Sequence, residues 1–387
     1  DDVNINTLQL RNRTENRWGS AKKGGTSITD NTTNIQSEIN SSGNLELVSG
    51  NDVNVTGSNL TSTNNLTITA TNDVNISAAQ DTSYREETYH KKGRTVAKSS
   101  ISMNQSLTNI HSTLTSGGNI SITSDANTNL IGAELSAVDI AINAGDELNI
   151  YSVEDQNYSY SASSKSRNFS AIAKYMPMVM LALTIYEKAG MPVTGNIASN
   201  LKSTINGDFS SKSNLDERQQ TINQASNLDA SGNITLTSNN NLTILGSNLN
   251  GSDGSLTSTA GDVNIYNVVD TDYSRSESHS SRTTLSSVGA GMIQSSAALL
   301  SAIYIYLDPT RTVYQKYEDI DDATKDMGTL PQKQEDHVSI KNDETIIASN
   351  LNFSNLTINS NQDTNVRSSD LAATSDLNIT SGNNTNI

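Results

Sequence analysis

The chain has 387 residues, of which 34% are hydrophobic and 4% aromatic, and its formal net charge is −16. This composition cannot fill the dense cores of two or three ordinary domains, but it can line the thin, continuous core of a solenoid. The acidic balance argues against nucleic acid as a partner. The absence of cysteine excludes disulfides and thiolate metal sites.

Apolar residues recur with a period of 21 from the first part of the chain onward. Leu45 and Val53 map by this period onto Leu66 and Val74. Within each rung the apolar residues come in pairs two positions apart, which indicates short strands with one buried face. Glycine, asparagine and aspartate lie between the pairs, where turns need them. The same period returns near the end, where it takes Leu242, Ile244, Leu356 and Ile358 onto Val263, Ile265, Leu377 and Ile379.

Stacking of these strands, rung on rung, would form parallel ladders about 4.8 Å apart with a shared core. We therefore predict an all-β fold, a right-handed parallel β-helix, as a single solenoid over residues 1–387. The strict spacing of the apolar residues argues against disorder. The chain begins at Asp1 and ends at Ile387 inside repeats, and no basic and apolar leader opens it, so we expect a piece of a longer chain.

A longer repeat lies above the rung, with four copies that begin near residues 42, 117, 231 and 353. The first three copies close on an aspartate followed three residues later by a tyrosine, at Tyr84, Tyr158 and Tyr273. Polar segments then leave and re-enter the pattern, which predicts hairpin excursions at 85–109, 160–220 and 275–337. We expect the three tyrosines to stack along the roots of these hairpins.

Two long apolar runs stand apart from the rest of the sequence. Their composition predicts inserted helices over 171–190 and 287–307, with a further helix over 312–327. Either these helices pack against the solenoid, or they contact a membrane or a partner; their lengths are marginal for a span of about 20 residues. The candidate contact residues are Met176, Met178, Val179, Met180, Leu181, Leu183, Ile185, Met292, Ile293, Leu299, Leu300, Ile303 and Ile305.

Three kinds of motif carry a resemblance that covers nearly all of the chain outside the long excursions. Copies open on Ser-Gly-Asn-Leu at 42–45, Asp-Val-Asn-Ile recurs at 73–76 and 262–265, and a Tyr-Arg-Glu-Glu-Thr-Tyr-His-Lys-Lys-Gly tail spans 84–93. The chain thus resembles the hemagglutinin-repeat region of filamentous hemagglutinin-type exoproteins, the family that includes contact-dependent growth inhibition effectors.

The resemblance implies a secreted protein on the bacterial cell surface, exported by an outer-membrane transporter of the two-partner type. It also implies adhesion, or delivery of a C-terminal toxin, through a receptor or the outer membrane of a target cell. The secretion domain and the toxin domain of that family are missing from this sequence, so the resemblance leaves adhesin and toxin carrier open.

The alternative function is that of a carbohydrate-active β-helix enzyme, which would need clustered carboxylates in a groove. Asp52, Asp73, Asp146 and Asp262 recur at turn positions, where hydrogen bonds to their own backbone explain them. We therefore expect no enzyme activity and no cofactor.

Metal binding is not expected either. The calcium-binding nonapeptide is absent, and the four histidines, at 90, 111, 279 and 337, show no metal spacing. The lone tryptophan, Trp18, lies near a basic stretch and is interpreted either as a packed residue at the tip of an earlier hairpin or as a binding aromatic.

Overall fold

A computed structural model describes residues 1–93, 96–166, 211–281 and 334–387. These residues form strands joined by turns, and they contain no helix. Among them, accordingly, no helix is long and apolar enough to cross a membrane. The segments expected to be helical, 171–190, 287–307 and 312–327, lie outside the described residues, so those three predictions stay predictions.

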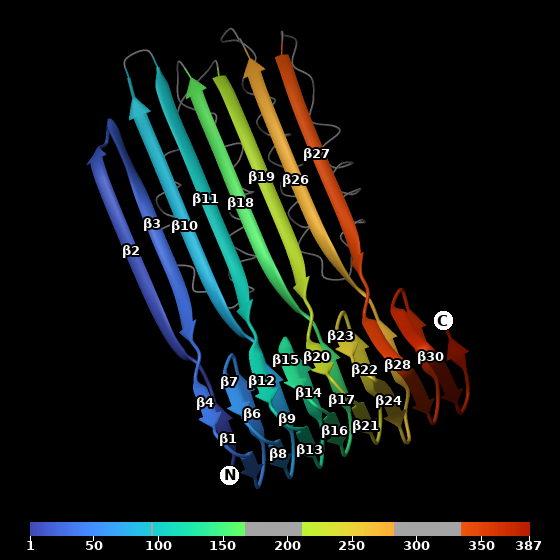
Figure 1. Cartoon of the computed structure of the whole chain (residues 1–387). Coiled ribbons are helices and arrows are strands. Elements are labelled where there is room, and N and C mark those ends of the chain that lie inside the picture. Colours follow the sequence, from blue (N-terminus) through green and yellow to red (C-terminus); the bar gives the residue numbers. More distant parts are fainter. Residues whose placement is uncertain (94–95, 167–210, 282–333) are drawn as a thin grey trace.

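Short strands stack into a parallel coil with three strands in each rung, as β7 (Asn59–Ser62), β8 (Leu66–Ala70) and β9 (Val74–Ser77) show (Figure 1). The first wall contains β9 together with β1 (Val3–Ile5), β6 (Val53–Thr56), β14 (Thr128–Ile131), β17 (Leu148–Tyr151), β22 (Leu242–Leu245), β25 (Val263–Tyr266), β29 (Thr364–Arg367) and β31 (Thr385–Asn386).

The other two walls run side by side and join through β28 (Asn350–Ser360), which contributes to both. The second wall contains β7, β4 (Glu38–Ser41), β12 (Ser112–Ser116), β15 (Ala133–Ala137), β20 (Asn227–Ala230) and β23 (Asn248–Asn250). The third contains β8, β5 (Leu45–Ser49), β13 (Ile120–Ser124), β16 (Ile140–Ala144), β21 (Ile234–Ser238) and β24 (Asp253–Ser258); β30 (Asp370–Ser381) pairs with β28. The predicted parallel β-helix is thus the architecture of the solenoid.

The core is a set of columns in which equivalent residues of successive rungs contact each other. Leu66 pairs with Leu45 on one side and with Ile120 on the other, and Ile120 pairs with Ile140. Leu66 and Ile120 are fully buried, whereas Leu45, on the end strand of its ladder, is half-buried. Where no excursion intervenes, one rung takes 21 residues from Leu45 to Leu66 and 20 residues from Ile120 to Ile140.

Asparagine ladders bind the rungs on the outside of the coil. The side-chain amide of Asn54 donates to Asn4 at 2.9 Å, that of Asn75 donates to Asn54 at 3.0 Å, and that of Asn129 donates to Asn75 at 2.9 Å. Each amide can donate to one neighbour and accept from the other, which repeats without limit along a parallel stack. The abundance of asparagine thus has a structural reason that the sequence did not reveal.

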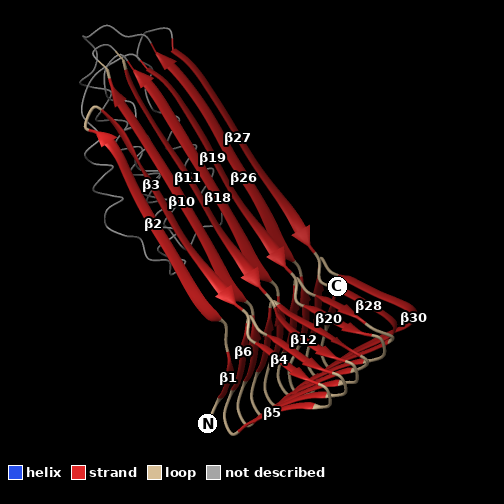
Figure 2. Ribbon diagram, turned by 60° about the vertical axis from the view of Figure 1, so that its left-hand side comes forward, coloured by secondary structure: helices blue, strands red, loops and turns tan. Residues whose placement is uncertain are grey.

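Long antiparallel strands leave the coil after every second rung and return to it (Figures 1 and 2). Within the described residues they make one eight-stranded sheet in the order β2 (Leu8–Ser20), β3 (Lys23–Ile35), β10 (Ala79–Lys92), β11 (Ala97–Ile110), β18 (Val153–Ser166), β19 (Ser211–Gln224), β26 (Val268–Ser281) and β27 (Gln334–Ile347). We call it the extra-helical sheet.

Geometry explains why this sheet is continuous. Two rungs advance the solenoid by two strand spacings, about 9.6 Å, and each excursion contributes two strands of the same spacing. Successive strand pairs consequently meet edge to edge, as β3 meets β10 and β11 meets β18. Pairing within and between excursions leaves free edges only at β2 and β27 among the described strands.

Glycines with positive φ mark the turns that lie against the excursion roots. Gly57, Gly132 and Gly246 have φ of 53°, 64° and 57°, and a Cβ atom at Gly132 would lie 2.8 Å from Val153 at the start of β18. Glycine is required there by both conformation and space. The equivalent position of the fourth copy holds Ser368, with φ of 46°.

Candidate functional site: the extra-helical sheet

An asparagine–aspartate clip joins each strand pair of the extra-helical sheet to the next. The backbone N–H of Asn34 donates to Asp81 Oδ1 at 2.6 Å, and its side-chain amide donates to the same oxygen at 2.9 Å. The contact recurs between successive pairs: Asn109 with Asp155, and Asn223 with Asp270. The repeated aspartate of the sequence therefore hydrogen-bonds each excursion to the one before it.

One face of the sheet, here the inner face, carries Tyr84, Glu86 and the residues level with them. Register places Tyr84, Gln105, Tyr158, Gln219 and Tyr273 in one row across five strands. The prediction that the tyrosines stack on each other is wrong in detail, because a glutamine of the returning strand separates each tyrosine from the next. The sequence showed the tyrosines but not the strand that lies between them.

Two carboxyl groups of the inner face, the buried Glu86 and the half-buried Glu217, accept hydrogen bonds from tyrosine hydroxyls. The Tyr84 hydroxyl donates to Glu86 at 2.5 Å, and Glu86 is only 3% exposed. The Tyr158 hydroxyl donates to Glu217 at 3.0 Å. Burial raises the pKa of Glu86 and that of Glu217, and the tyrosine hydrogen bonds oppose that rise.

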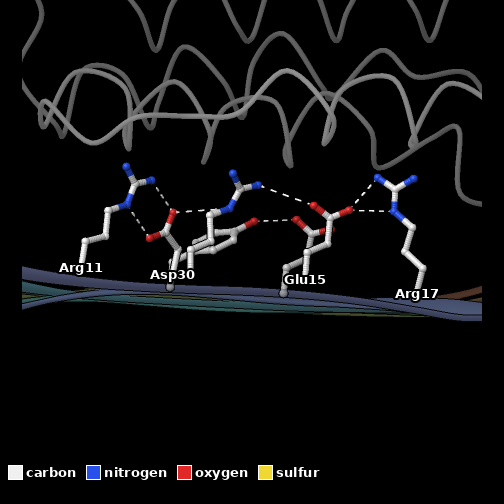
Figure 3. A network of polar contacts seen from close by, with 7 residues as sticks. Arg11, Glu15, Arg17 and Asp30 are labelled. Carbon is white, nitrogen blue, oxygen red and sulfur yellow. Dashed lines mark hydrogen bonds and ion pairs between the residues drawn. The ribbon is translucent and has the colours of Figure 1, made fainter.

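Ion pairs extend this arrangement onto the first strand (Figure 3). Arg11 binds both carboxylate oxygens of Asp30, at 2.8 and 2.6 Å, and Arg17 binds Glu15 at 2.7 Å. Figure 3 shows these side chains on one side of the sheet, one after another along the strand. The bidentate pair of Arg11 and Asp30 joins β2 to β3 in a fixed orientation, whereas Arg17 and Glu15 pair within β2.

The opposite face, here the outer face, is open and polar. A shallow depression of about 360 Å³ crosses four strands there. Its lining residues are serine, asparagine, glutamine, arginine and tyrosine, and carbon atoms make up more of the exposed lining surface than oxygen and nitrogen atoms do. Its outward-pointing residues include Arg85, Asn104, Ser159 and Arg218, which share one register row. Such a lining combines carbon surface with hydrogen-bonding groups, as ligand sites commonly do.

The arginines of the depression are already neutralised. Arg85 binds Glu87 at 2.5 Å, and Arg218 binds Asp272 with two hydrogen bonds, at 2.9 and 2.5 Å. The Arg218 hydrogen bonds lower the pKa of Asp272, although burial opposes them. The depression therefore offers hydrogen-bonding groups rather than free positive charge.

Trp18 lies near the far end of the outer face, where β2 turns into β3. Its ring stacks on Tyr89 of β10 at 5.9 Å between centroids, and it covers Gly25, whose Cβ would lie 2.8 Å from the indole. Trp18 is 49% exposed, so half of its surface contacts neighbours and half faces solvent. The interpretation as a packed residue near the tip agrees with these contacts, and the interpretation as a binding aromatic stays a prediction.

The sequence-predicted contact residues, Met176 to Ile185 and Met292 to Ile305, all lie outside the described residues. The turn aspartates lie within the described residues. The prediction that they bind their own backbone is wrong. Asp52 accepts instead from the backbone N–H of Asp73 in the next rung at 3.1 Å, and Asp73 accepts from that of Asn127 at 2.9 Å. Within the described ranges, no three histidine or acidic side chains cluster as metal ligands would.

Sequence reasoning missed the outer face. Its residues are single serines, asparagines and arginines that are far apart in the chain, and only strand register brings them together. The spacing from each repeated tyrosine could have aligned the outgoing strands, because Arg85 and Ser159 each follow that tyrosine directly.

Comparison with known proteins decides the family. The sequence model described as the hemagglutinin repeat matches residues 18–171 and 205–303, well over half of the chain. This chain belongs to the hemagglutinin repeat family. No curated protein and no solved structure matched it. Hemagglutinin-repeat proteins are typically secreted, surface-associated exoproteins with structural and adhesive roles, and the family is associated with two-partner secretion.

Proposed function

We propose that this chain makes contact with a target cell through the outer face of the extra-helical sheet, while the solenoid serves as the support. The observation that carries the proposal is the shape of the sheet: eight described strands form one platform with an exposed polar face and a depression of about 360 Å³. A solenoid built only for length would need no such platform. Specialised surfaces of repeat proteins lie on insertions of this kind.

The contact serves either adhesion or the delivery of a C-terminal toxin, as in contact-dependent growth inhibition. Export through an outer-membrane transporter of the two-partner type accompanies both, and the family's association with that route supports it. The class of target cell separates the two: a bacterial target supports toxin delivery, whereas a host-cell target supports adhesion. The apolar runs 171–190 and 287–307 are the competing contact sites.

The chain is proposed to act without catalysis. On the inner face the Tyr84 hydroxyl binds buried Glu86, and the nearby Glu15 is bound by Arg17. Glycoside hydrolysis needs two carboxyl groups free to act on a sugar, whereas Glu15 and Glu277 are held in ion pairs with Arg17 and Arg275. The tyrosine partner and the burial of Glu86 suit a structural role. Release of reducing ends from a polysaccharide incubated with the chain would contradict this proposal.

The test is binding of the fluorescently labelled chain to intact bacteria and to cultured animal cells. Asn104→Trp would fill the depression, and Val48→Trp, on an exposed part of the solenoid, is the matched control. We expect Asn104→Trp to reduce binding about tenfold and Val48→Trp to leave it unchanged. If Asn104→Trp binds cells as well as the wild type and deletion of 171–190 abolishes binding, the contact site is the apolar run and not the outer face.

A further inference from the structure

Five lysines form a single row near the far end of the extra-helical sheet. Register pairs Lys23 with Lys91, Lys91 with Lys98, Lys98 with Lys165 and Lys165 with Lys212, on the neighbouring strands β3, β10, β11, β18 and β19. All five are exposed. Lys91 and Lys165 lie six residues after the outer-face residues Arg85 and Ser159, and side chains an even number of residues apart on one strand point to the same face. The other three lysines pair with these two, so the whole row lies on the outer face.

This row is costly to the fold. Like charges at directly opposite positions of neighbouring strands destabilise a sheet. Lysines that protect a sheet from aggregation belong on its edge strands, whereas these five occupy interior strands. Structural stability therefore does not explain the row.

The row also differs from the other basic residues of the outer face. Arg85, Arg218 and Lys341 each bind a carboxylate, namely Glu87, Asp272 and Asp343. None of the five ammonium groups in the row has an ion pair within the described residues. On the described part of the outer face, uncompensated positive charge is thus concentrated in this row, although the chain as a whole has a net charge of −16.

The neighbouring row supplies a second kind of contact. Trp18 and Tyr89 stand at one end of it as a stacked, partly exposed pair, and Ser100, Ser163 and Asn214 continue it across the sheet. An aromatic face can cover the apolar side of a sugar ring, and hydroxyl and amide groups can bind sugar hydroxyls. A single-stranded nucleic acid would favour aromatics at intervals along the whole site, which this row lacks.

The geometry points to a binding site for a linear acidic polysaccharide with one carboxylate on each sugar ring, held by the lysine row and steadied by Trp18 and Tyr89. Because the lysine row crosses the strands, the bound polymer runs across them too, parallel to the solenoid. The row spans four strand spacings, about 19 Å. This site deepens the proposed function, on which it rests, by naming the chemistry of the surface that is contacted.

The experiment measures binding of the whole chain to polygalacturonate oligomers by titration calorimetry. Lys98→Gln/Lys165→Gln removes the centre of the row, Trp18→Ala removes the aromatic face, and Lys341→Gln removes a paired lysine of the same face as a control. We expect the double variant to bind at least tenfold more weakly, Trp18→Ala several-fold more weakly, and the control within twofold of the wild type. Circular dichroism confirms that each variant is folded.

Salt and competing ligands complete the test. Binding should weaken steeply as salt is raised to about 1 M, where charge screening is nearly complete. Dextran, a neutral polysaccharide, should not bind. Equal affinity of the double variant and the wild type would overturn the site, as would stronger binding to a thymidine oligonucleotide or to phosphatidylglycerol vesicles than to polygalacturonate.

The two proposals fail separately. If the chain binds cells and Lys98→Gln/Lys165→Gln binds them equally well, the polysaccharide site is wrong and the contact function stands. If the chain binds polygalacturonate through the row but binds no cell, the contact function is wrong and the site stands.

Discussion

Asn109 donates both its backbone N–H and its side-chain amide to one carboxylate oxygen of Asp155, at 2.7 and 2.9 Å. The two residues belong to different excursions, and their bond stands where the edge of one strand pair meets the next. Asn109 is 9% exposed, so the contact is largely shielded from water. Its recurrence at three junctions makes the extra-helical sheet one body rather than a row of separate hairpins.

Removing one clip should loosen the sheet. Asp155→Ala leaves two donors of Asn109 without their acceptor, which costs about 2–3 kcal/mol when the acceptor is charged. Glu154→Ala changes the adjacent exposed residue, whose carbonyl alone binds Asn109, and should cost less than about 0.5 kcal/mol. Hydrogen exchange of the β11 and β18 amides measures both, and equal exchange in the two variants would contradict the role of the clip.

The core columns predict a second pair of outcomes. Val55 is fully buried, and Val55→Asp would place a carboxylate between apolar rungs, at a cost of several kcal/mol. Val48 is 59% exposed on the same rung, so Val48→Asp makes the same chemical change at almost no cost. Thermal unfolding followed by circular dichroism separates the two. A wild-type melting curve for Val55→Asp would show that Val55 does not face the core.

The stability of the turns that pack against the excursion roots should depend on glycine. Gly132→Ala combines a positive φ with a Cβ 2.8 Å from Val153, and we expect a loss of about 1–3 kcal/mol. Gly43→Ala is the control, because nothing lies within 4 Å of its Cβ and its φ is not positive; there alanine should be neutral or slightly stabilising. Chemical denaturation gives both values, and equal stability of the two variants would contradict the account.

The buried carboxyl of Glu86 predicts a dependence on pH. Burial raises the pKa of this carboxyl above its ordinary value of 4.5. The protein is therefore most stable with respect to this group below pH 4.5, and that stability is lost as pH rises through the raised pKa. Glu86→Gln should therefore be increasingly more stable than the wild type as pH rises from 4 to 8. Tyr84→Phe removes the hydrogen bond that opposes the rise and should steepen the loss.

Trp18 is the lone tryptophan and lies on the extra-helical sheet, so its fluorescence reports unfolding of this sheet. A difference between Glu86→Gln and the wild type that stays constant from pH 4 to 8 would contradict a raised pKa of Glu86.

The rung could be predicted because its signal is local. The spacing of Val53 and Val55 predicts a strand, and Val74 and Ile76 repeat this spacing after one turn of the coil. A fixed separation in sequence therefore corresponds to neighbouring positions in the stack. The excursions were visible as interruptions that begin near the same tyrosine. Their long strands carry few apolar residues in alternation, and this hid their assembly into a sheet.

The outer face could not be predicted for the same reason. Lys23 and Lys212 belong to one row although 189 positions separate them in sequence, and only the register of four intervening pairings brings them together. A partial signal exists, since Lys91 and Lys165 each follow the repeated tyrosine by seven residues. The returning strands offer no such marker, because their asparagine clips become recognisable only in the structure.

The most direct test of the central claim is a disulfide across the junction of two excursions, in a chain that has no cysteine of its own. Ser106 of β11 pairs with Asn157 of β18, at a Cα separation of about 4.5–5.5 Å, which suits a disulfide. Oxidation of Ser106→Cys/Asn157→Cys should consume both thiols within a single chain. Ser106→Cys/Ser161→Cys, offset by four residues or about 13 Å, should keep both thiols free. Free thiols in the first variant, or equal crosslinking in both, would show that the excursions do not form one continuous sheet.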